Sequence, residues 1–466
     1  MKIDVVLNVD ERITKKIKYG FTLLFQPLRV EVIFSDEVKD NSITILYGKE
    51  SPSSQNKIFH LRASHEFEEC IEHSRLPDIS HLEWLEFERK RLPKLFPVSG
   101  AAIDFDIAAA AFMLASEFQD LISLERDEFD RLRAMDSLQD KLGILDYPAV
   151  NYYSIFLKEK LEKFFDTGIE LKKYADADHG IALTHDVDYT SSLNLRMIKR
   201  NIFGHAILNK ENLTPNERAV KFLRPLLAMT GYDPPKNGLK FLRETELRSG
   251  LKSTFFIKTG ATAREDMNYH YRSRSLRNFM RSLMNHGFDI GIHPSMRTYI
   301  EGEQLILEKT RLENLVGKEI NSVRQHYLKF TAGKTVGIWE NARLKYDSTL
   351  GFSRKAGFRN SIAFPFPLYD FQKDRISTVT ELPLMIMDGT FSANRSQPVN
   401  ETYDKMKKLV DETKAAHGAA SILFHNSLAD PIDFPGYKRI YSRLLSEAEN
   451  DRFRMDSLSG IIEQFR

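Results

Sequence analysis

The sequence predicts a parallel α/β fold in the C-terminal two-thirds of the chain, and three observations lead to this prediction. Short apolar runs of strand length alternate with segments of helical periodicity from residue 180 onward, as in sheets whose parallel strands are joined by helices. Acids and histidines close several of these runs, and active sites lie at the carboxyl ends of such strands. With 466 residues and 42% hydrophobic content, the chain is long enough for two domains.

The N-terminal part predicts a smaller unit of a different kind. Short apolar or alternating runs suggest strands, and longer apolar periodic segments suggest helices. The expected elements are strands over 30–34 and 42–47 and helices over 104–121 and 152–165. The polar stretch 172–180 offers little to bury and marks a boundary. We therefore expect an N-terminal α+β domain over 1–172 and a second domain over 178–466.

The elements of the second domain follow in order along the chain. The expected strands cover 181–184, 253–257, 288–292, 379–387 and 419–425, and the expected helices cover 238–247, 276–286 and 400–416.

Composition excludes several classes of protein. Lys and Arg total 67 against 65 Asp and Glu, so the chain lacks the basic field that nucleic-acid binding requires. The single cysteine, Cys70, cannot form an intramolecular disulfide and suits a reducing compartment. No signal peptide or membrane-spanning segment is expected, because charges interrupt the N-terminus and the apolar stretch 107–115 is too short. These features predict a cytoplasmic protein in which any metal is held by His and Asp.

The strand endings carry the candidate chemistry. Asp186 and Asp188 share a face of an extended chain, and two adjacent carboxylates persist most easily beside a cation or a shared proton. A capping or turn pair is the alternative. His293, His326 and His425 close or follow later apolar runs. A lone histidine at a strand end is more often structural than a ligand, but several such endings in one domain favour a site.

In order, the segments 184–188, 289–297, 324–327 and 422–425 resemble the motifs of the polysaccharide deacetylases, also called the NodB-homology family or carbohydrate esterase family 4. The sequence is most similar to a divergent branch that carries Thr-His-Asp-Val-Asp, His-Pro-Ser, Arg-Gln-His-Tyr-Leu and a strand ending in His-Asn. This resemblance covers about residues 180–466. It implies a distorted (β/α)7-type barrel and a divalent metal, with zinc as the first expectation.

The resemblance also implies roles for individual residues. Asp186 would be the general base, and His425 the acid that protonates the departing amine. Arg324 would fix Asp186 through a charged hydrogen bond, and Tyr327 would line the site.

Two departures from the family pattern affect the metal ligands. Val187 stands at the usual second carboxylate, so we expect Asp188 to replace it from the same face of the strand. Arg297 stands at the usual second histidine and cannot bind a cation. The expected metal ligands are therefore Asp188, His293 and His326, with His185 as a weaker candidate for the missing imidazole.

The implied function is a metal-dependent hydrolase that removes an N-acetyl group from a sugar or glycan in bacterial surface-polysaccharide metabolism. The alternatives are a catalytically silent glycan-binding protein of the same fold and a hydrolase of a non-sugar C–N amide. The segment 191–221 is basic and amphipathic. It is either a solvated surface helix or a peripheral membrane contact, which would suit a lipid-linked glycan. The sequence does not indicate an oligomeric state.

Overall fold

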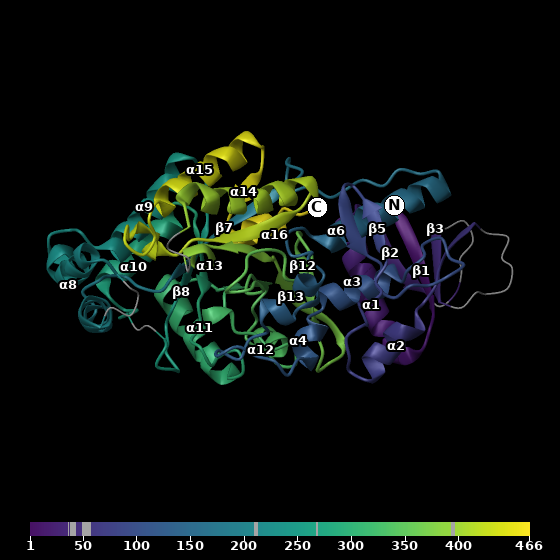
Figure 1. The fold of residues 1–466 in the computed structure, drawn as a ribbon, viewed down its shortest axis with the longest axis horizontal. Coiled ribbons are helices and arrows are strands. Elements are labelled where there is room, and N and C mark those ends of the chain that lie inside the picture. Colours follow the sequence, from purple (N-terminus) through teal and green to yellow (C-terminus); the bar gives the residue numbers. More distant parts are fainter. Residues whose placement is uncertain (36, 38–42, 49–56, 209–212, 267–268, 393–396) are drawn as a thin grey trace.

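The structure is a computed structural model that describes residues 1–35, 37, 43–48, 57–208, 213–266, 269–392 and 397–466. It is a mixed α/β protein with an N-terminal part on one side and a larger part, built around a curled sheet, on the other (Figure 1). No helix among these residues is both long enough and apolar enough to cross a membrane.

The N-terminal part contains a parallel four-stranded sheet, which differs from the expected α+β arrangement. The strand order is β2 (Glu31–Ser35), β1 (Lys2–Asn8), β3 (Ile43–Gly48), β4 (Ile58–Leu61). Helix α1 (Glu11–Phe25) connects β1 to β2, and such a crossover is what a parallel pair requires. The expected strand over 42–47 is β3, although Ser42 lies outside the described residues.

The helix expected over 104–121 is broken into two. Helix α3 (Ile107–Ala115) ends at Ser116, and α4 (Phe118–Ile122) begins after Glu117, whose φ of 65° is left-handed. The Glu117 carboxylate is buried and accepts hydrogen bonds from Arg359 and Asn360 of the C-terminal part. The break therefore positions a buried charge against its partner.

The remaining N-terminal elements are helices and a short antiparallel hairpin. They are α2 (His65–Glu72), β5 (Trp84–Phe87), β6 (Lys90–Pro93), η1 (Ala134–Asp136), α5 (Leu138–Lys141) and α6 (Ala149–Phe165). Helix α6 corresponds to the helix expected over 152–165.

The larger part is organised by a ten-stranded sheet. Its path runs β12 (Phe366–Asp370), β13 (Arg375–Glu381), β11 (Tyr346–Asp347), β10 (Ser322–Val323), β9 (Asp289–Ile292), β8 (Thr254–Ile257), β7 (Gly180–Val187), β15 (Ala419–Leu423), β14 (Leu384–Met387), and β16 (Arg454–Asp456) also pairs with β7. All pairings are parallel except that of β12 with β13.

The strand expected over 379–387 is divided at Pro383, which has no N–H to donate to a ladder. On one side of the proline, β13 pairs with β11, and on the other, β14 pairs with β15. The same segment therefore contacts both ends of the curled sheet.

Helices cover the outer surface of the curled sheet (Figure 1). They include α9 (Pro234–Arg248), α10 (Arg274–Asn285), α11 (Gly302–Val316), α12 (Thr335–Asn341), α14 (Val399–Ala415), α15 (Tyr437–Asn450) and α16 (Leu458–Glu463). The helices expected over 238–247, 276–286 and 400–416 are present as α9, α10 and α14. Strand β7 is buried along its whole length, as expected for a parallel strand covered on both faces.

The two parts share one continuous hydrophobic core that includes residues of α1, α3 and α6 together with the large sheet. The side chain of Asn151 on α6 donates to the carbonyl oxygen of Ala363 at 3.2 Å. The N-terminal part is therefore packed firmly against the larger one.

Candidate active site

Polar residues that follow the parallel strands meet at one edge of the curled sheet. Asp186 lies near the end of β7 and Asp188 follows that strand, while His293 follows β9 and His425 follows β15. Strands β15, β7, β8 and β9 are parallel neighbours, so their carboxyl ends lie side by side. Alternation along β7 places Asp186 and Asp188 on one face and turns His185 to the other.

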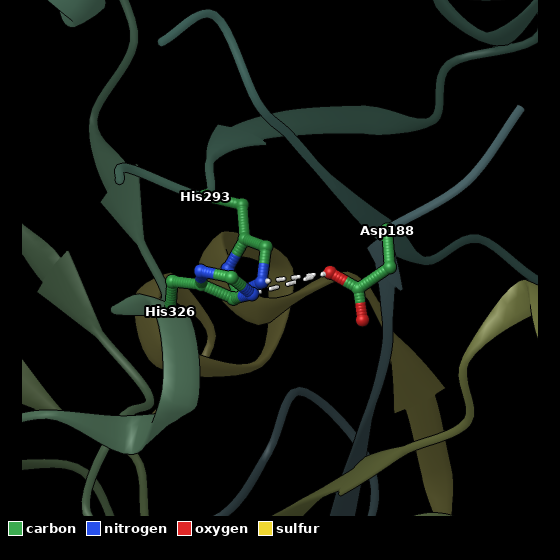
Figure 2. Close-up of side chains that lie close together, drawn as sticks. All are labelled: Asp188, His293 and His326. Atoms are coloured by element: carbon green, nitrogen blue, oxygen red, sulfur yellow. Dashed lines mark ion pairs between the residues drawn. The ribbon is translucent and has the colours of Figure 1, made fainter. Parts of the chain in front are cut away.

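Asp188, His293 and His326 form a compact cluster of three donors. Their side chains point toward one another (Figure 2), and one ligand atom from each lies within 4.8 Å of the other two. Oδ1 of Asp188 is 3.5 Å from Nε2 of His293 and 3.6 Å from Nε2 of His326. The structure thus brings together the three residues expected to bind metal.

Hydrogen bonds orient both imidazole rings. Nδ1 of His293 donates to the carbonyl oxygen of Arg324 at 2.6 Å, and Nδ1 of His326 is 2.7 Å from Oδ1 of Asp266. Burial raises the pKa of Asp266, but hydrogen bonds from His326 and backbone amides outweigh it and hold that pKa below its usual value. Asp266 is therefore a carboxylate acceptor, and in the neutral tautomer that these bonds select, each ring turns the lone pair of Nε2 to the centre.

Lys258, directly after β8, places a cation among these donors. Its Nζ atom lies 2.7 Å from Oδ1 of Asp188 and 2.7 Å from Nε2 of His326. Burial, followed by the charge of Lys258, lowers the pKa of His326 to about 4. The His326 ring is therefore neutral at physiological pH, as a metal ligand must be.

The donor set fits a divalent metal. Ligand atoms about 2.0–2.1 Å from a tetrahedral zinc ion lie roughly 3.3–3.5 Å apart, close to the spacing of Asp188 and the two histidines. The ammonium of Lys258 already occupies a cation position between two of them. Metal binding would require this flexible side chain to withdraw from the centre.

The positions of Arg297 and His185 bear on which residue provides the second imidazole. Arg297 lies outside the cluster: its side chain is 62% exposed, and Nη1 is 3.7 Å from Glu301. His185 is buried with Nδ1 2.8 Å from the carbonyl oxygen of Phe424 and Nε2 2.6 Å from Glu246. His185 is therefore held on the opposite face of β7 and is not a ligand, whereas His326 supplies the second imidazole of the cluster.

His425 is paired with an acid that we did not single out from the sequence. Asp388 follows β14, and its Oδ1 atom lies 2.6 Å from Nδ1 of His425, while Oδ2 accepts from the His425 backbone N–H. Burial lowers the pKa of His425, but the charge and hydrogen bond of Asp388 outweigh burial and raise that pKa to about 9. The ring is therefore protonated at neutral pH, with Nε2 3.7 Å from Oδ2 of Asp188.

Asp186 presents an unpaired carboxylate oxygen to the site. The residue is buried, and its Oδ2 atom is 3.7 Å from Nε2 of His293. Oδ1 has no hydrogen-bond partner among the described residues. A buried carboxylate oxygen without a partner is costly, so this atom is suited to a ligand, water or reacting proton.

Arg324 supports Asp186 in a different way from the one expected. No hydrogen bond joins these two side chains in the described part of the chain; Nη2 donates instead to Thr184 at 3.2 Å and to Ser348 at 3.0 Å. Burial lowers the pKa of Arg324, and the charge of Asp186 opposes this shift. The guanidinium therefore acts on Asp186 through its charge.

Tyr327 contributes to the wall of the site. It has a φ of 60°, which is uncommon for a residue other than glycine. Its ring stacks on Phe129 with 4.7 Å between centroids, and its carbonyl oxygen accepts from Nη1 of Arg131 at 2.6 Å. Burial raises the pKa of Tyr327 to about 12, so the hydroxyl stays protonated. Both partners of Tyr327 belong to the N-terminal part.

Two adjoining cavities open from the cluster. One, of about 360 Å³, is lined by Asp186, Asp188, His293, His326 and Tyr327, together with Phe129 and Arg131. The other, of about 490 Å³, extends toward residues that follow β7, including Met197 and Arg200. The two share Asp188, Tyr189, Gly389 and His425. The cluster therefore lies at the middle of an elongated cleft.

Sequence reasoning missed Lys258, Asp266, Asp388 and the contribution of the N-terminal part. Lys258 and Asp388 could have been found, because each closes an apolar strand in the same way as Asp188 and His293. Asp266 and Phe129 lie in loops with no comparable signal.

One family model matches the N-terminal part of the chain. A family of unknown function, DUF7033, matches residues 6–166. None of the curated proteins compared matches the sequence.

Among solved structures, a protein assigned as a polysaccharide deacetylase from Mycobacterium smegmatis is similar at 14% identity, with 62% of this chain and 90% of that chain covered and a TM-score of 0.39. An allantoinase is similar at 11% identity, over 62% of this chain and 91% of that chain, with a TM-score of 0.40. A pseudoenzyme of carbohydrate esterase family 4 from Bacillus anthracis is similar at 8% identity, over 63% of this chain and 69% of that chain, with a TM-score of 0.33. We infer the function of this chain from its own residues.

Proposed function

We propose that this chain is a metal-dependent hydrolase that removes an N-acetyl group from a sugar or glycan. The observation that carries this proposal is the convergence of three functions in one cleft. Asp188, His293 and His326 form a donor cluster, Asp186 offers an unpaired carboxylate oxygen, and His425 carries a proton. These are the groups that hydrolysis of an unactivated amide requires.

Asp188, His293 and His326 would hold the metal, which on binding supplies Lewis acidity toward the amide carbonyl and lowers the pKa of a bound water. The carboxylate–imidazole donor set suits zinc, and nickel, cobalt or manganese less specifically. Nδ1 hydrogen bonds to Arg324 and Asp266 keep the two imidazoles in the tautomer that can bind.

Two side chains carry out the proton transfers of the proposed reaction, Asp186 as the base and His425 as the acid. Asp186 removes a proton from the attacking water, because Oδ1 has no other partner among the described residues. His425 gives its Nε2 proton to the departing amine, and Asp388 then stabilises the ring through Nδ1. Arg324 places a positive charge near Asp186, and Tyr327 excludes water from one wall of the cleft.

The proposal extends to the type of barrel, the physiological substrate and the cellular compartment. We take β13 and β14 as one interrupted strand that makes up the seven strands of a distorted barrel together with β7, β8, β9, β10, β11 and β15; β12 and β16 lie outside this count. The physiological substrate would be a glycan of the bacterial cell surface, and the compartment the cytoplasm, which the single cysteine suits.

A catalytically silent glycan-binding protein is the second candidate, and the position of Lys258 favours it. An ammonium between Asp188 and His326 could replace a metal permanently and leave a binding cleft without chemistry. Hydrolysis of a non-sugar C–N amide is a third candidate that requires the same residues.

One experiment separates these candidates. The metal-loaded protein is incubated with N-acetylated sugars, nucleotide sugars and oligosaccharides, and with cyclic ureides, and the products are examined by mass spectrometry. Replacement of acetyl by hydrogen that disappears in Asp186→Asn supports the deacetylase. Sugar binding without any product supports the silent protein, and turnover of the ureides alone supports the third candidate.

A further inference from the structure

The helical segment between β7 and β8 has an unusual distribution of polarity. It comprises α7 (Leu195–Lys199), η2 (Arg200–Ile207) and α8 (Pro215–Met229), and α8 lies at the end of the molecule farthest from the N-terminal part (Figure 1). Helix α8 buries Lys221 and Arg224. Its apolar side chains are turned to solvent instead, with exposures of 52% for Phe222, 46% for Leu223, 61% for Leu226 and 74% for Met229.

This inverted arrangement is fixed by buried ion pairs. Nζ of Lys221 lies 2.6 Å from Asp433 and 3.2 Å from Asp430, and Nη2 of Arg224 donates to Asp430 at 3.0 Å. Breaking a buried pair of this kind is strongly destabilising. The ion pairs therefore hold the polar face of α8 inward and keep its apolar face outward.

The neighbouring helix extends the exposed apolar surface. Phe203, Ile207 and Leu208 are each more than half exposed. Ile207 lines one shallow hollow, of about 410 Å³, together with Phe222 and Leu223 of α8. An apolar surface shared by two helices in this way marks an interaction site, because soluble monomers rarely leave such patches uncovered.

The excess of basic residues around this surface indicates which kind of partner it fits. From 191 to 232 the sequence contains seven Lys or Arg and two Glu. Two of the seven are engaged by Asp430 and Asp433, which leaves a basic excess in this segment, and Arg218 lines the apolar hollow itself. A basic rim around inserted apolar side chains is typical of helices that lie on anionic membranes. A second copy of this chain would face like charge instead.

The same segment contributes to the cleft. Met197, Arg200 and Arg224 line the cavity that also contains Asp188 and His425. A surface that rests on a bilayer would therefore bring the cleft close to the lipid head groups.

We propose that the apolar surface of η2 and α8 docks on an anionic lipid bilayer and so presents the cleft to an N-acetylated sugar carried on a membrane lipid. The second part of this statement rests on the proposed hydrolase function. Docking itself does not, because it needs neither metal nor turnover.

Vesicle sedimentation tests the docking. The full chain is mixed with vesicles of phosphatidylcholine, with or without phosphatidylglycerol. We expect binding to the anionic vesicles, weakened at least about tenfold in Phe222→Ser/Leu226→Ser, since two apolar side chains no longer leave water. The matched control is Ile306→Ser/Leu307→Ser on α11, where both side chains are similarly exposed, and it should bind as wild type does.

Three outcomes would overturn the docking proposal: no binding of the wild type to anionic vesicles, equal binding by Phe222→Ser/Leu226→Ser, or equal loss in the control. Sedimentation velocity of the same proteins without lipid tests whether the surface binds a second copy of this chain instead. Self-association that the double variant abolishes, without vesicle binding, would assign the surface to a second copy.

Turnover tests the substrate. With an N-acetylated sugar lipid in vesicles, Phe222→Ser/Leu226→Ser should lose about tenfold in rate, while turnover of the same head group in free solution stays unchanged. Equal loss on both substrates would contradict a membrane-held substrate. Vesicle binding without hydrolysis of either substrate would leave docking in place and overturn the hydrolase function, so the two failures are distinguishable.

Discussion

The ammonium of Lys258 lies 2.7 Å from Nε2 of His326, one of the three atoms proposed to bind metal. A metal ion and an ammonium cannot both use this nitrogen lone pair, and their charges repel. The protein is therefore expected to exchange one cation for the other, with Lys258 as the resident cation in the metal-free state.

Replacing this lysine should strengthen metal binding. In Lys258→Met the competing charge is absent, so we expect zinc affinity to rise by roughly tenfold or more. Competition with a chromophoric chelator measures the affinity, and Lys252→Met, at an exposed lysine, is the control. If Lys258 is instead a permanent replacement for the metal, neither the wild type nor Lys258→Met will bind zinc at the site, and Lys258→Met will weaken sugar binding.

The ligand set makes a second prediction. His293→Ala and His326→Ala should each abolish stoichiometric metal, because a two-ligand site with one imidazole binds far more weakly. Arg297→Ala should retain full occupancy, since that side chain is exposed and paired with Glu301. Elemental analysis after gel filtration provides the measurement. Full occupancy in either histidine variant, or its loss in Arg297→Ala, would mean that the metal is bound elsewhere.

Acid and base substitutions should affect turnover without affecting the metal. Removing a positioned base or acid typically costs ~10²–10⁴-fold in rate, so Asp186→Asn and His425→Ala should lose activity by that amount. Metal content and the circular dichroism spectrum should match those of wild type. A loss that appears only in KM would assign these residues to binding and contradict their roles in proton transfer.

The proximity of Asp188 and His293 could be predicted from the sequence, because it follows from local strand geometry. Asp188 and His293 follow apolar strands, and alternation alone puts Asp188 on the face of Asp186. Lys258 follows a strand in the same way and could have been included on that ground, although lysine is almost never fully buried. The surroundings of Tyr327 could not be predicted from the sequence, because its partner Arg131 is 196 residues away and only the packing of the two parts brings them together.

The interruption of the helix at Glu117 also could not be predicted from the local sequence. Residues 104–121 have a continuous helical pattern, yet the chain leaves the helix so that Glu117 can bind Arg359. The stability of that buried pair decides the local conformation, and its partner lies 242 positions away.

This pair leads to a prediction about stability. In Glu117→Gln the buried Arg359 guanidinium loses its hydrogen-bonded counter-charge and keeps only Asp120, at 3.8 Å, which should lower the free energy of unfolding by about 3–5 kcal/mol. Urea denaturation followed by tryptophan fluorescence measures the change. The matched control is Glu128→Gln, which removes an exposed ion pair with Arg354 and should cost at most about 1 kcal/mol. Equal effects in the two variants would contradict a special role for the buried pair.

The last prediction concerns the proton on His425. Burial disfavours its charged form, but Asp388 outweighs burial and raises the pKa of the ring to about 9. Because the folded-state pKa exceeds the unfolded value of about 6.5, the ion pair contributes full stability below pH 6.5 and loses it as the pH rises through about 9. Asp388→Asn removes the negative neighbour, so the pKa of His425 should fall well below 9. NMR titration of the ring in metal-free protein measures this directly. With metal bound, the alkaline limb of kcat/KM should move to lower pH in the same variant, whereas an unchanged limb would mean that His425 is not the acid.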